Sequence, residues 1–204
     1  MRIKIFGAGS IGNHLAQASR RMGWDVVMVD PDESALDRTK NEIYPGRYGS
    51  WDEGIQLFTP DAAPKGEFDI IFLGTPPHIR MQLAKEVLSE EPRIIQMEKP
   101  LCTPDLSKVD DFLAELKKHN TQVVTGYDHV VSEATEVAEN IFRSGKLGDL
   151  QALDVEFRET WKGIFKAHAW LSGPQDTYLG FWKRGGVLQE NTLMLLISGS
   201  TSLI

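Results

Sequence analysis

Three glycines near the amino end limit what this chain can fold into. Gly7, Gly9 and Gly12 form the pattern G-x-G-x-x-G, directly after the apolar run at residues 2–6 and directly before a helical pattern at residues 14–22. Glycine permits a tight turn at Gly7, a close backbone approach at Gly9, and contact between helix and strand at Gly12. The pattern therefore predicts a strand, a tight turn and a helix in succession.

The remainder of the first 125 residues alternates between short apolar runs and helical patterns. Strand-like runs lie at residues 25–30, 68–74, 93–97 and 122–128, and helical patterns lie at residues 79–88 and 109–118. Such alternation is typical of a parallel sheet. Some of these runs are almost continuously apolar, which indicates strands that are covered by helices on both faces. Residues 1–125 are therefore predicted to form an α/β domain, a Rossmann-type doubly wound parallel sheet.

Two stretches depart from this rhythm. Between Pro31 and Glu67, prolines and glycines interrupt the pattern, so only a short strand or helix is expected there. After residue 125, a helix is predicted over residues 132–148 and a strand with one polar face over residues 150–161. These elements predict that residues 126–204 form the start of an α+β second domain that is too short to be finished.

Composition excludes several classes of protein. The net charge of −7 is spread along the chain, so no basic face for nucleic acid or an anionic membrane is expected. Cys102 is the one cysteine, which indicates a reducing compartment, a packing role for the thiol and no metal site. No signal-peptide region and no apolar run of about 18 residues is present. We expect a cytoplasmic protein with neither nucleic acid nor a membrane as partner.

The glycine pattern also carries a prediction about binding. The first turn of the following helix, at Ser10, Ile11 and Gly12, would present free N–H groups and a partial positive charge to a diphosphate. Asp30 closes the next strand about twenty residues further on. Its carboxylate could accept hydrogen bonds from an adenosine ribose and would repel a 2′-phosphate. The combination predicts NAD rather than NADP as cofactor, the alternative being that the glycines form only a structural turn.

Two further segments resemble parts of the Gfo/Idh/MocA family, which includes glucose–fructose oxidoreductase and inositol dehydrogenase. LGTPPHIRMQLAKEVL at residues 73–88 is similar to the family's T-P-x-x-H segment, and IIQMEKPLCTP at residues 94–104 to its E-K-P segment. The E-K-P segment is the most specific of the family's motifs. With the glycine pattern before them and the stretches that follow, the resemblance extends over nearly all of residues 1–190.

Both segments follow predicted strands, at the edge where parallel α/β sheets bind ligands. Thr75 and Pro76 predict a stiff ledge for the nicotinamide half of the cofactor. His78 is expected either to contact the cofactor or only to begin a helix. Glu98 and Lys99 close the next strand and are expected at the same crevice. The resemblance implies that Lys99 is catalytic and polarises a substrate hydroxyl near the nicotinamide, the alternative being a solvated charge.

The resemblance implies hydride transfer at a sugar, inositol or related polyol carbon, and a homo-oligomer in the full-length form. A histidine in the second domain supplies the acid–base group in the family, and it would be well suited to accept a proton near neutral pH. Here RGGVLQE at residues 184–190 is followed by no histidine. The alternative function is therefore a non-catalytic nucleotide-binding fragment.

The last residues, 191–204, carry no charged side chain and are largely apolar. They are either a terminal apolar helix or the product of a disrupted reading frame. Codons permitted for this segment, read two bases later, translate as H-S-H-A-L-N-L-W-Q-H-F-S-H, which continues the preceding segment as in the family. We expect a frame disruption and a C-terminally truncated chain, which the gene sequence beyond Glu190 would test.

Overall fold

The computed structural model describes residues 1–149, 151 and 161–186. The chain divides into two compact units, Met1–Thr125 and Gly126–Ile204. The strand predicted over residues 150–161 lies outside the described residues except at positions 151 and 161, and the terminal segment 187–204 lies outside them entirely.

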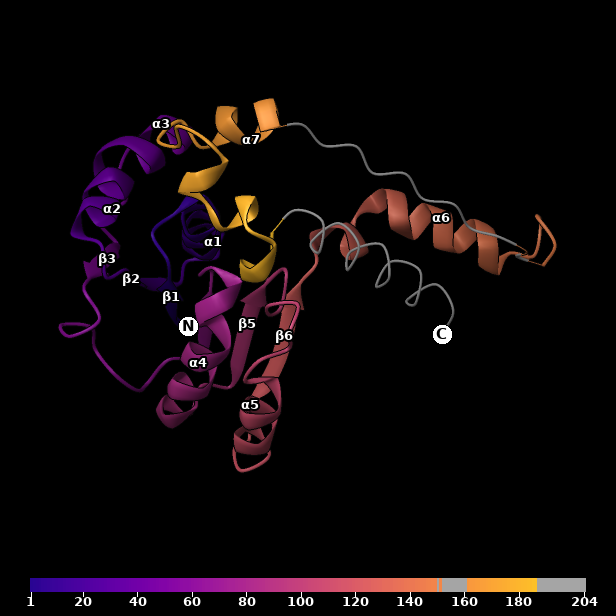
Figure 1. The fold of residues 1–204 in the computed structure, drawn as a ribbon, viewed down its shortest axis with the longest axis horizontal. Coiled ribbons are helices and arrows are strands. Elements are labelled where there is room, and N and C mark those ends of the chain that lie inside the picture. Colours follow the sequence, from indigo (N-terminus) through magenta and orange to yellow (C-terminus); the bar gives the residue numbers. More distant parts are fainter. Residues whose placement is uncertain (150, 152–160, 187–204) are drawn as a thin grey trace. The chain divides into compact units, whose positions relative to one another are not determined.

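A parallel sheet forms the centre of the first unit (Figure 1). Within the described residues its strands are β1 (Arg2–Phe6), β2 (Asp25–Val29), β3 (Ile55–Phe58), β4 (Ile70–Leu73), β5 (Ile94–Glu98) and β6 (Gln122–Gly126). Their spatial order is β3-β2-β1-β4-β5-β6. The first three strands are therefore added toward one edge of the sheet and the last three toward the other, and the order reverses between β1 and β4. The register places Ile3 of β1 beside Val26 of β2 on one side and Ile70 of β4 on the other. The prediction of a Rossmann-type parallel sheet is confirmed.

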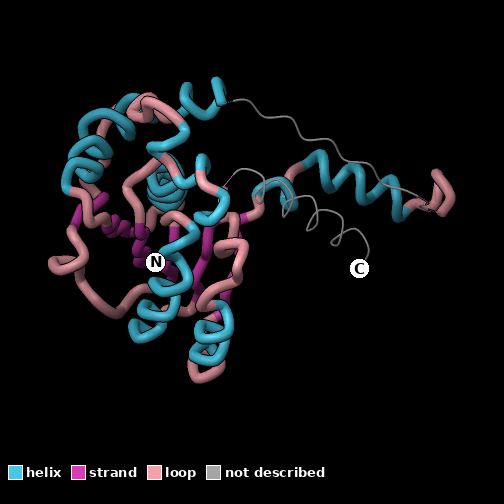
Figure 2. The backbone as a smooth tube through the Cα atoms, viewed as in Figure 1, coloured by secondary structure: helices cyan, strands magenta, loops and turns pink. Residues whose placement is uncertain are grey.

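Helices connect these strands and lie around the sheet (Figure 2). They are α1 (Ser10–Arg21), α2 (Glu33–Arg38), the π-helical segment η1 (Thr39–Ile43), α3 (Tyr44–Tyr48), α4 (Pro77–Val87), the 3-10 segment η2 (Leu88–Glu90) and α5 (Val109–Leu116). None of the helices in the described part of the chain is long and apolar enough to cross a membrane.

Two apolar clusters show that both faces of the sheet are covered. Successive side chains of a strand point to opposite faces. On β2, Val27 and Val29 therefore join a cluster with α4 and α5, whereas Val26 and Met28 join a cluster with α1, α2 and α3. This division explains why the strand sequences are almost continuously apolar, because neither face is left to water.

The expectation of only a short strand or helix between residues 31 and 67 was wrong in extent. The region contains both β3 and a continuous helical stretch from Glu33 to Tyr48. Prolines and glycines were expected to interrupt the pattern here, but Pro45 lies within the first turn of α3. A proline there removes no required hydrogen bond, since the helix restarts after the π-helical segment.

The second unit contains short helices in its described residues. Helix α6 (Glu133–Arg143) is capped by Ser132, whose Oγ accepts a hydrogen bond of 3.2 Å from the Thr135 amide. It ends earlier than the predicted span of residues 132–148. The other described elements are η3 (Asp128–Val131), α7 (Trp161–Ala167), η4 (Pro174–Asp176), η5 (Tyr178–Gly180) and η6 (Trp182–Arg184).

A buried ion pair joins β1 to the end of η2 in the first unit. The Lys4 side chain is 1% exposed, and its Nζ lies 2.8 and 2.5 Å from the two Glu90 carboxylate oxygens. The ammonium also lies 4.4 Å from the centre of the Phe68 ring. Burial lowers the pKa of Lys4, and the hydrogen bond that Lys4 donates to Glu90 opposes that shift. The charge of Lys4 is therefore stabilised mainly by one carboxylate.

We expect Glu90→Gln to lower the free energy of unfolding by about 3 kcal/mol, because it leaves a buried ammonium without its counter-charge. The deficit relative to wild type should shrink as the pH rises toward the usual pKa of lysine, since neutral Lys4 no longer needs a carboxylate. Urea unfolding at several pH values measures both effects.

Glu67→Gln is the matched control for this experiment. Arg2 lies on β1, as Lys4 does, and forms an ion pair of 3.5 Å with Glu67. The Glu67 side chain, however, is 90% exposed. Its loss should change the free energy of unfolding by less than about 1 kcal/mol. Equal effects of the two substitutions would contradict the assigned role of the buried pair.

Candidate cofactor-binding site

The predicted site segments meet at one edge of the sheet. Asp30, Gly7, Gly74 and Lys99 each follow the carboxyl end of a strand, and these strands are neighbours in the order β2-β1-β4-β5. The Gly7 amide donates a hydrogen bond of 2.8 Å to the Val29 carbonyl, so the strand pairing continues up to the edge. The gap between β1 and β4, where the order of the strands reverses, is the position at which open α/β sheets bind ligands.

Two of the motif glycines are required by close contact within the fold. Gly7 has φ of +107°, a conformation that side chains disfavour, and a Cβ on it would lie 3.1 Å from the Gly74 carbonyl oxygen. A Cβ on Gly12 would lie 1.8 Å from the Gly7 carbonyl oxygen. That oxygen belongs to the backbone, so no side-chain rotation can make room. Helix α1 can therefore start against the end of β1 only with glycine at position 12.

Gly9 differs from the other two because the space around it is open. A Cβ on Gly9 would meet no atom within 4 Å, although Gly9 is the N-cap of α1. No side chain caps the helix, and its first turn contains no acidic residue. The amides of Ser10 and Ile11 in that turn can thus serve an anion. Open space next to an uncapped helix start fits the diphosphate of a dinucleotide.

Asp30 holds the glycine loop through its carboxylate. Its Oδ2 accepts a hydrogen bond of 2.8 Å from the Ala8 amide, and its Oδ1 accepts one of 2.9 Å from the Asp32 amide. A carboxylate can accept about four hydrogen bonds. The half-buried Asp30 therefore retains acceptor capacity for ribose hydroxyls while it anchors the loop.

The nicotinamide-side residues follow β4 and β5. Thr75 is buried, and its hydroxyl has no hydrogen-bond partner among the described residues. Pro76 is the N-cap of α4, whereas His78 in the first turn of that helix is exposed. Glu98 and Lys99 are half-buried directly at the end of β5. The Thr75 hydroxyl is thus a buried polar group next to the predicted nicotinamide ledge.

Arg80 connects these two segments and was missed in the sequence. Its side chain is 1% exposed, and its guanidinium donates hydrogen bonds to the carbonyl oxygens of Thr75, Glu98 and Pro100. A planar guanidinium can serve several acceptors in fixed directions. The sequence contained one sign of this role, because Arg80 is a charged residue on the buried face of α4. The other buried residues of that helix are Pro77, Met81, Ala84 and Val87.

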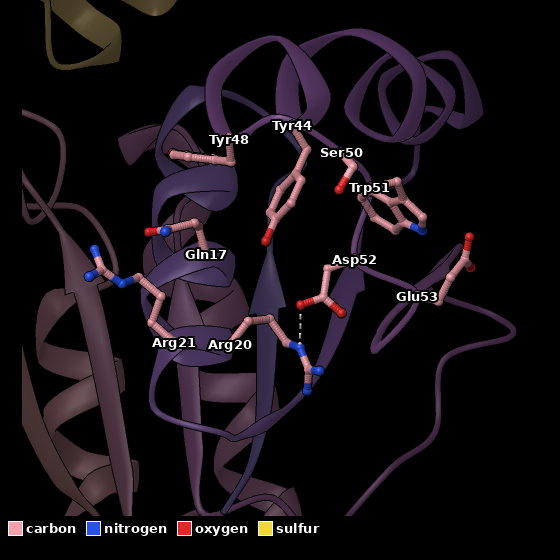
Figure 3. A pocket seen from close by; sticks show the side chains of 9 residues that line it. All are labelled: Gln17, Arg20, Arg21, Tyr44, Tyr48, Ser50, Trp51, Asp52 and Glu53. Atoms are coloured by element: carbon pink, nitrogen blue, oxygen red, sulfur yellow. Dashed lines mark hydrogen bonds and ion pairs between the residues drawn. The ribbon is translucent and has the colours of Figure 1, made fainter.

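An open pocket lies elsewhere in the first unit, beside the last turns of α1 (Figure 3). Arg20 Nε donates a hydrogen bond of 2.9 Å to Asp52 Oδ2 within it, and this bond lowers the pKa of the carboxyl. Asp52 precedes β3, so the pocket lies toward the amino ends of the strands. None of the predicted site residues lines it. Its lining residues are Gln17, Arg20, Arg21, Tyr44, Tyr48, Ser50, Trp51, Asp52 and Glu53.

Metal binding has no candidate cluster in the part of the chain that the structure describes. No three side chains of His, Cys, Asp or Glu gather there in a way that could hold an ion. Cys102 is buried, and burial raises the pKa of its thiol. A thiol with a raised pKa is a poor nucleophile near neutral pH.

A glycine loop at the start of a helix, with an acid at the end of the next strand, defines the class of dinucleotide-binding Rossmann domains. Comparison with known proteins then gives the family. Residues 1–127 match the model of the Gfo/Idh/MocA oxidoreductase family, whose matching part is an NAD-binding Rossmann fold. The match covers more than half of the chain, so the chain belongs to this family and residues 1–127 are its NAD-binding domain. A search of curated proteins found no match.

Solved structures share the fold at low sequence identity. Scyllo-inositol dehydrogenase from Lactobacillus casei, with bound NAD(H) and scyllo-inositol, is 18% identical over 73% of this chain and 42% of its own, with a TM-score of 0.58. Myo-inositol 2-dehydrogenase from Lactobacillus plantarum is 21% identical over 74% of this chain and 43% of its own, with a TM-score of 0.58. The chain thus spans less than half the length of these relatives.

A third structure with this fold is the transcriptional regulator Gal80p from Kluyveromyces lactis. It is 12% identical to this chain, with a TM-score of 0.70 over 98% of this chain and 50% of its own. The likeness shows a shared fold that is present in a regulator as well as in dehydrogenases.

We expect Gly9→Val and Gly12→Val to act differently. Gly9→Val should keep the free energy of unfolding within about 1 kcal/mol of wild type, because the substituted position is open. It should weaken NADH binding at least tenfold, because the side chain occupies the space for the diphosphate. NADH fluorescence titration and urea unfolding measure the two effects.

Gly12→Val is the comparison in the same motif. It should weaken binding and also lower the free energy of unfolding by about 3 kcal/mol, since its side chain meets the Gly7 backbone. Unchanged NADH affinity in Gly9→Val would contradict the placement of the diphosphate.

Proposed function

We propose that the chain binds NAD(H) in preference to NADP(H), and that its strand ends form the cofactor side of an active site for hydride transfer. The observation that carries the proposal is the row of Asp30, the glycine loop, Thr75–Pro76 and Glu98–Lys99 along adjacent strand ends. The order of these groups corresponds to ribose, diphosphate and nicotinamide in a dinucleotide.

Each part of the row has a distinct task in this proposal. The amides of Ser10 and Ile11 bind the diphosphate, and Asp30 accepts hydrogen bonds from the adenosine ribose. Thr75 and Pro76 support the nicotinamide, which supplies the hydride acceptor when the cofactor is bound. Lys99 donates a hydrogen bond to the substrate oxygen and stabilises the negative charge that develops there as the hydroxyl proton leaves.

The proposed substrate is a polyol with a ring or chain of secondary alcohols, of which inositols are the best candidates. Two solved structures that share the fold are inositol dehydrogenases, and one of them holds scyllo-inositol. His78 is exposed on the first turn of α4 and is proposed as a peripheral cofactor contact. Specificity among polyols would depend on residues of the second domain.

The alternative proposal is nucleotide binding without catalysis. RGGVLQE at residues 184–190 is followed by no histidine that could act as an acid–base group. The same fold occurs in a transcriptional regulator. NADH should bind under either proposal, whereas reduction of NAD in the presence of an inositol should be seen only with the enzyme. Incubation of the chain with NAD and a panel of inositols, followed by nicotinamide absorbance, separates the two.

We expect Asp30→Asn to reduce the preference for NADH over NADPH about tenfold. Asparagine has a single acceptor oxygen, so it can keep the hydrogen bond from the Ala8 amide or the one from the Asp32 amide, but not both. The lost bond should weaken the binding of both cofactors alike, whereas the lost negative charge removes only the repulsion of a 2′-phosphate, and a repulsion of about 1.4 kcal/mol corresponds to the tenfold change in the ratio. Parallel titrations with the two reduced cofactors measure the ratio. Asp37→Asn, on the exposed face of α2, is the charge-matched control and should leave the ratio unchanged.

We expect Lys99→Met to lower the rate of inositol-dependent NAD reduction at least about a hundredfold, because the methionine keeps the length of the side chain but cannot donate a proton. NADH affinity should change by no more than about threefold, since the other cofactor contacts remain. A retained rate would contradict the assigned role of Lys99. A chain that binds NADH and shows no inositol-dependent reduction even as wild type would favour the non-catalytic alternative.

A further inference from the structure

A buried polar pair lies directly behind the glycine loop and is not part of the glycine motif. Asn13 follows the last motif glycine on α1, and Thr39 is the first residue of η1. Both side chains are completely buried. Asn13 Nδ2 donates to Thr39 Oγ1 over 3.1 Å. The pair thus joins the start of α1 to a helix that lies 26 residues further along the chain.

Both residues bind the carbonyl groups of the loop. Thr39 Oγ1 donates a hydrogen bond of 2.6 Å to the Ala8 carbonyl oxygen. Asn13 Nδ2 donates to the Gly9 carbonyl oxygen over 2.8 Å and approaches that of Ala8 at 3.3 Å. Because the donors are buried, the two carbonyl groups point into the interior of the unit. They do not point into the open space next to Gly9.

The peptide groups of Ala8 are therefore held from both sides. Asp30 accepts a hydrogen bond from the Ala8 amide at 2.8 Å, and Thr39 and Asn13 hold its carbonyl oxygen. A carbonyl oxygen that turned outward would place a partial negative charge next to a diphosphate and weaken its binding. Three side chains, from two helices and a strand end, thus fix which face of the loop an anion meets.

A polar atom of this pair is not used by the fold. Asn13 Oδ1 is buried and has no hydrogen-bond partner among the described residues. An unsatisfied buried acceptor costs free energy of folding. Stability alone would therefore not favour asparagine at this position. The donor side of the same amide, which holds the loop, accounts for its presence.

We propose that Asn13 and Thr39 are positioning residues for the cofactor diphosphate. They hold the carbonyl groups of Ala8 and Gly9 inward, so that only N–H groups of the loop and of α1 face the phosphates. The role rests on the NAD(H) binding proposed above. It assigns to η1 a task in cofactor binding, although η1 carries no residue of the glycine motif.

Thr39→Val tests the proposal in the full chain, because valine keeps the shape of threonine and removes the hydroxyl donor. We expect the affinities for NADH and for ADP-ribose to fall about tenfold, as for one lost hydrogen bond. The affinity for adenosine, which has no phosphate, should change less than about twofold. Thr39→Ser restores the hydroxyl and should bring both diphosphate affinities back to within about twofold of wild type.

Thr121→Val is the matched control, since Thr121 Oγ1 donates a comparable bond of 2.7 Å to the Pro92 carbonyl before β5, away from the loop. It should leave all three affinities unchanged. Asn13→Ala provides a second test of the loop if Thr39→Val proves unstable, with the same expected split between ADP-ribose and adenosine. Thermal unfolding of every variant shows whether the folded fraction is equal.

Two results would overturn the proposal. The first is wild-type ADP-ribose affinity in folded Thr39→Val and Asn13→Ala. The second is an equal loss for adenosine and ADP-ribose, which would mark the pair as a general structural contact. Failure of the wild-type chain to bind NADH at all would instead overturn the proposed function, and the role of the pair with it.

Discussion

The site depends on one backbone contact, the approach of Gly12 to the Gly7 carbonyl oxygen. A methyl group at Gly12 would lie 1.8 Å from that oxygen, and one at Gly7 would lie 3.1 Å from the carbonyl of Gly74. Backbone therefore meets backbone at the ends of β1 and β4 and at the start of α1. Since no side chain separates these segments, the helix start lies at the sheet edge where the strand order changes, and the amides proposed to bind the diphosphate lie there with it.

Charge is distributed unevenly along this edge. Asp30 places a carboxylate at the end of β2, whereas Lys99 and the buried Arg80 place cations at β5 and behind it. Arg80 donates hydrogen bonds to the carbonyl oxygens of Thr75, Glu98 and Pro100, which stabilise its charge. The edge thus offers an acceptor at the proposed ribose end and cations at the proposed hydride-transfer end.

The sequence was sufficient for most of the sheet and for the glycine loop because both depend on local patterns. Apolar runs revealed the strands other than β3, and the spacing of Gly7, Gly9 and Gly12 revealed the loop. The helical stretch around Pro45 was missed because a proline is tolerated where a helix restarts. Asn13 and Thr39 were missed for another reason. Their contact joins segments 26 residues apart, and no local period records such a contact.

The residues proposed to bind the cofactor and those that the proposed hydride transfer would need lie in different parts of the chain. Every residue proposed to touch the cofactor lies between Gly7 and Lys99, within a unit whose sheet has an apolar cluster on each face. The buried contacts that shape the loop, including those of Asp30 and Thr39, also lie within that unit. Cofactor binding as proposed therefore uses residues of this unit alone. Hydride transfer also needs a group that positions the polyol and takes up its proton, which the family resemblance assigns to the second domain. Under the proposed function, affinity for NADH would report on the first unit, and turnover would report on both.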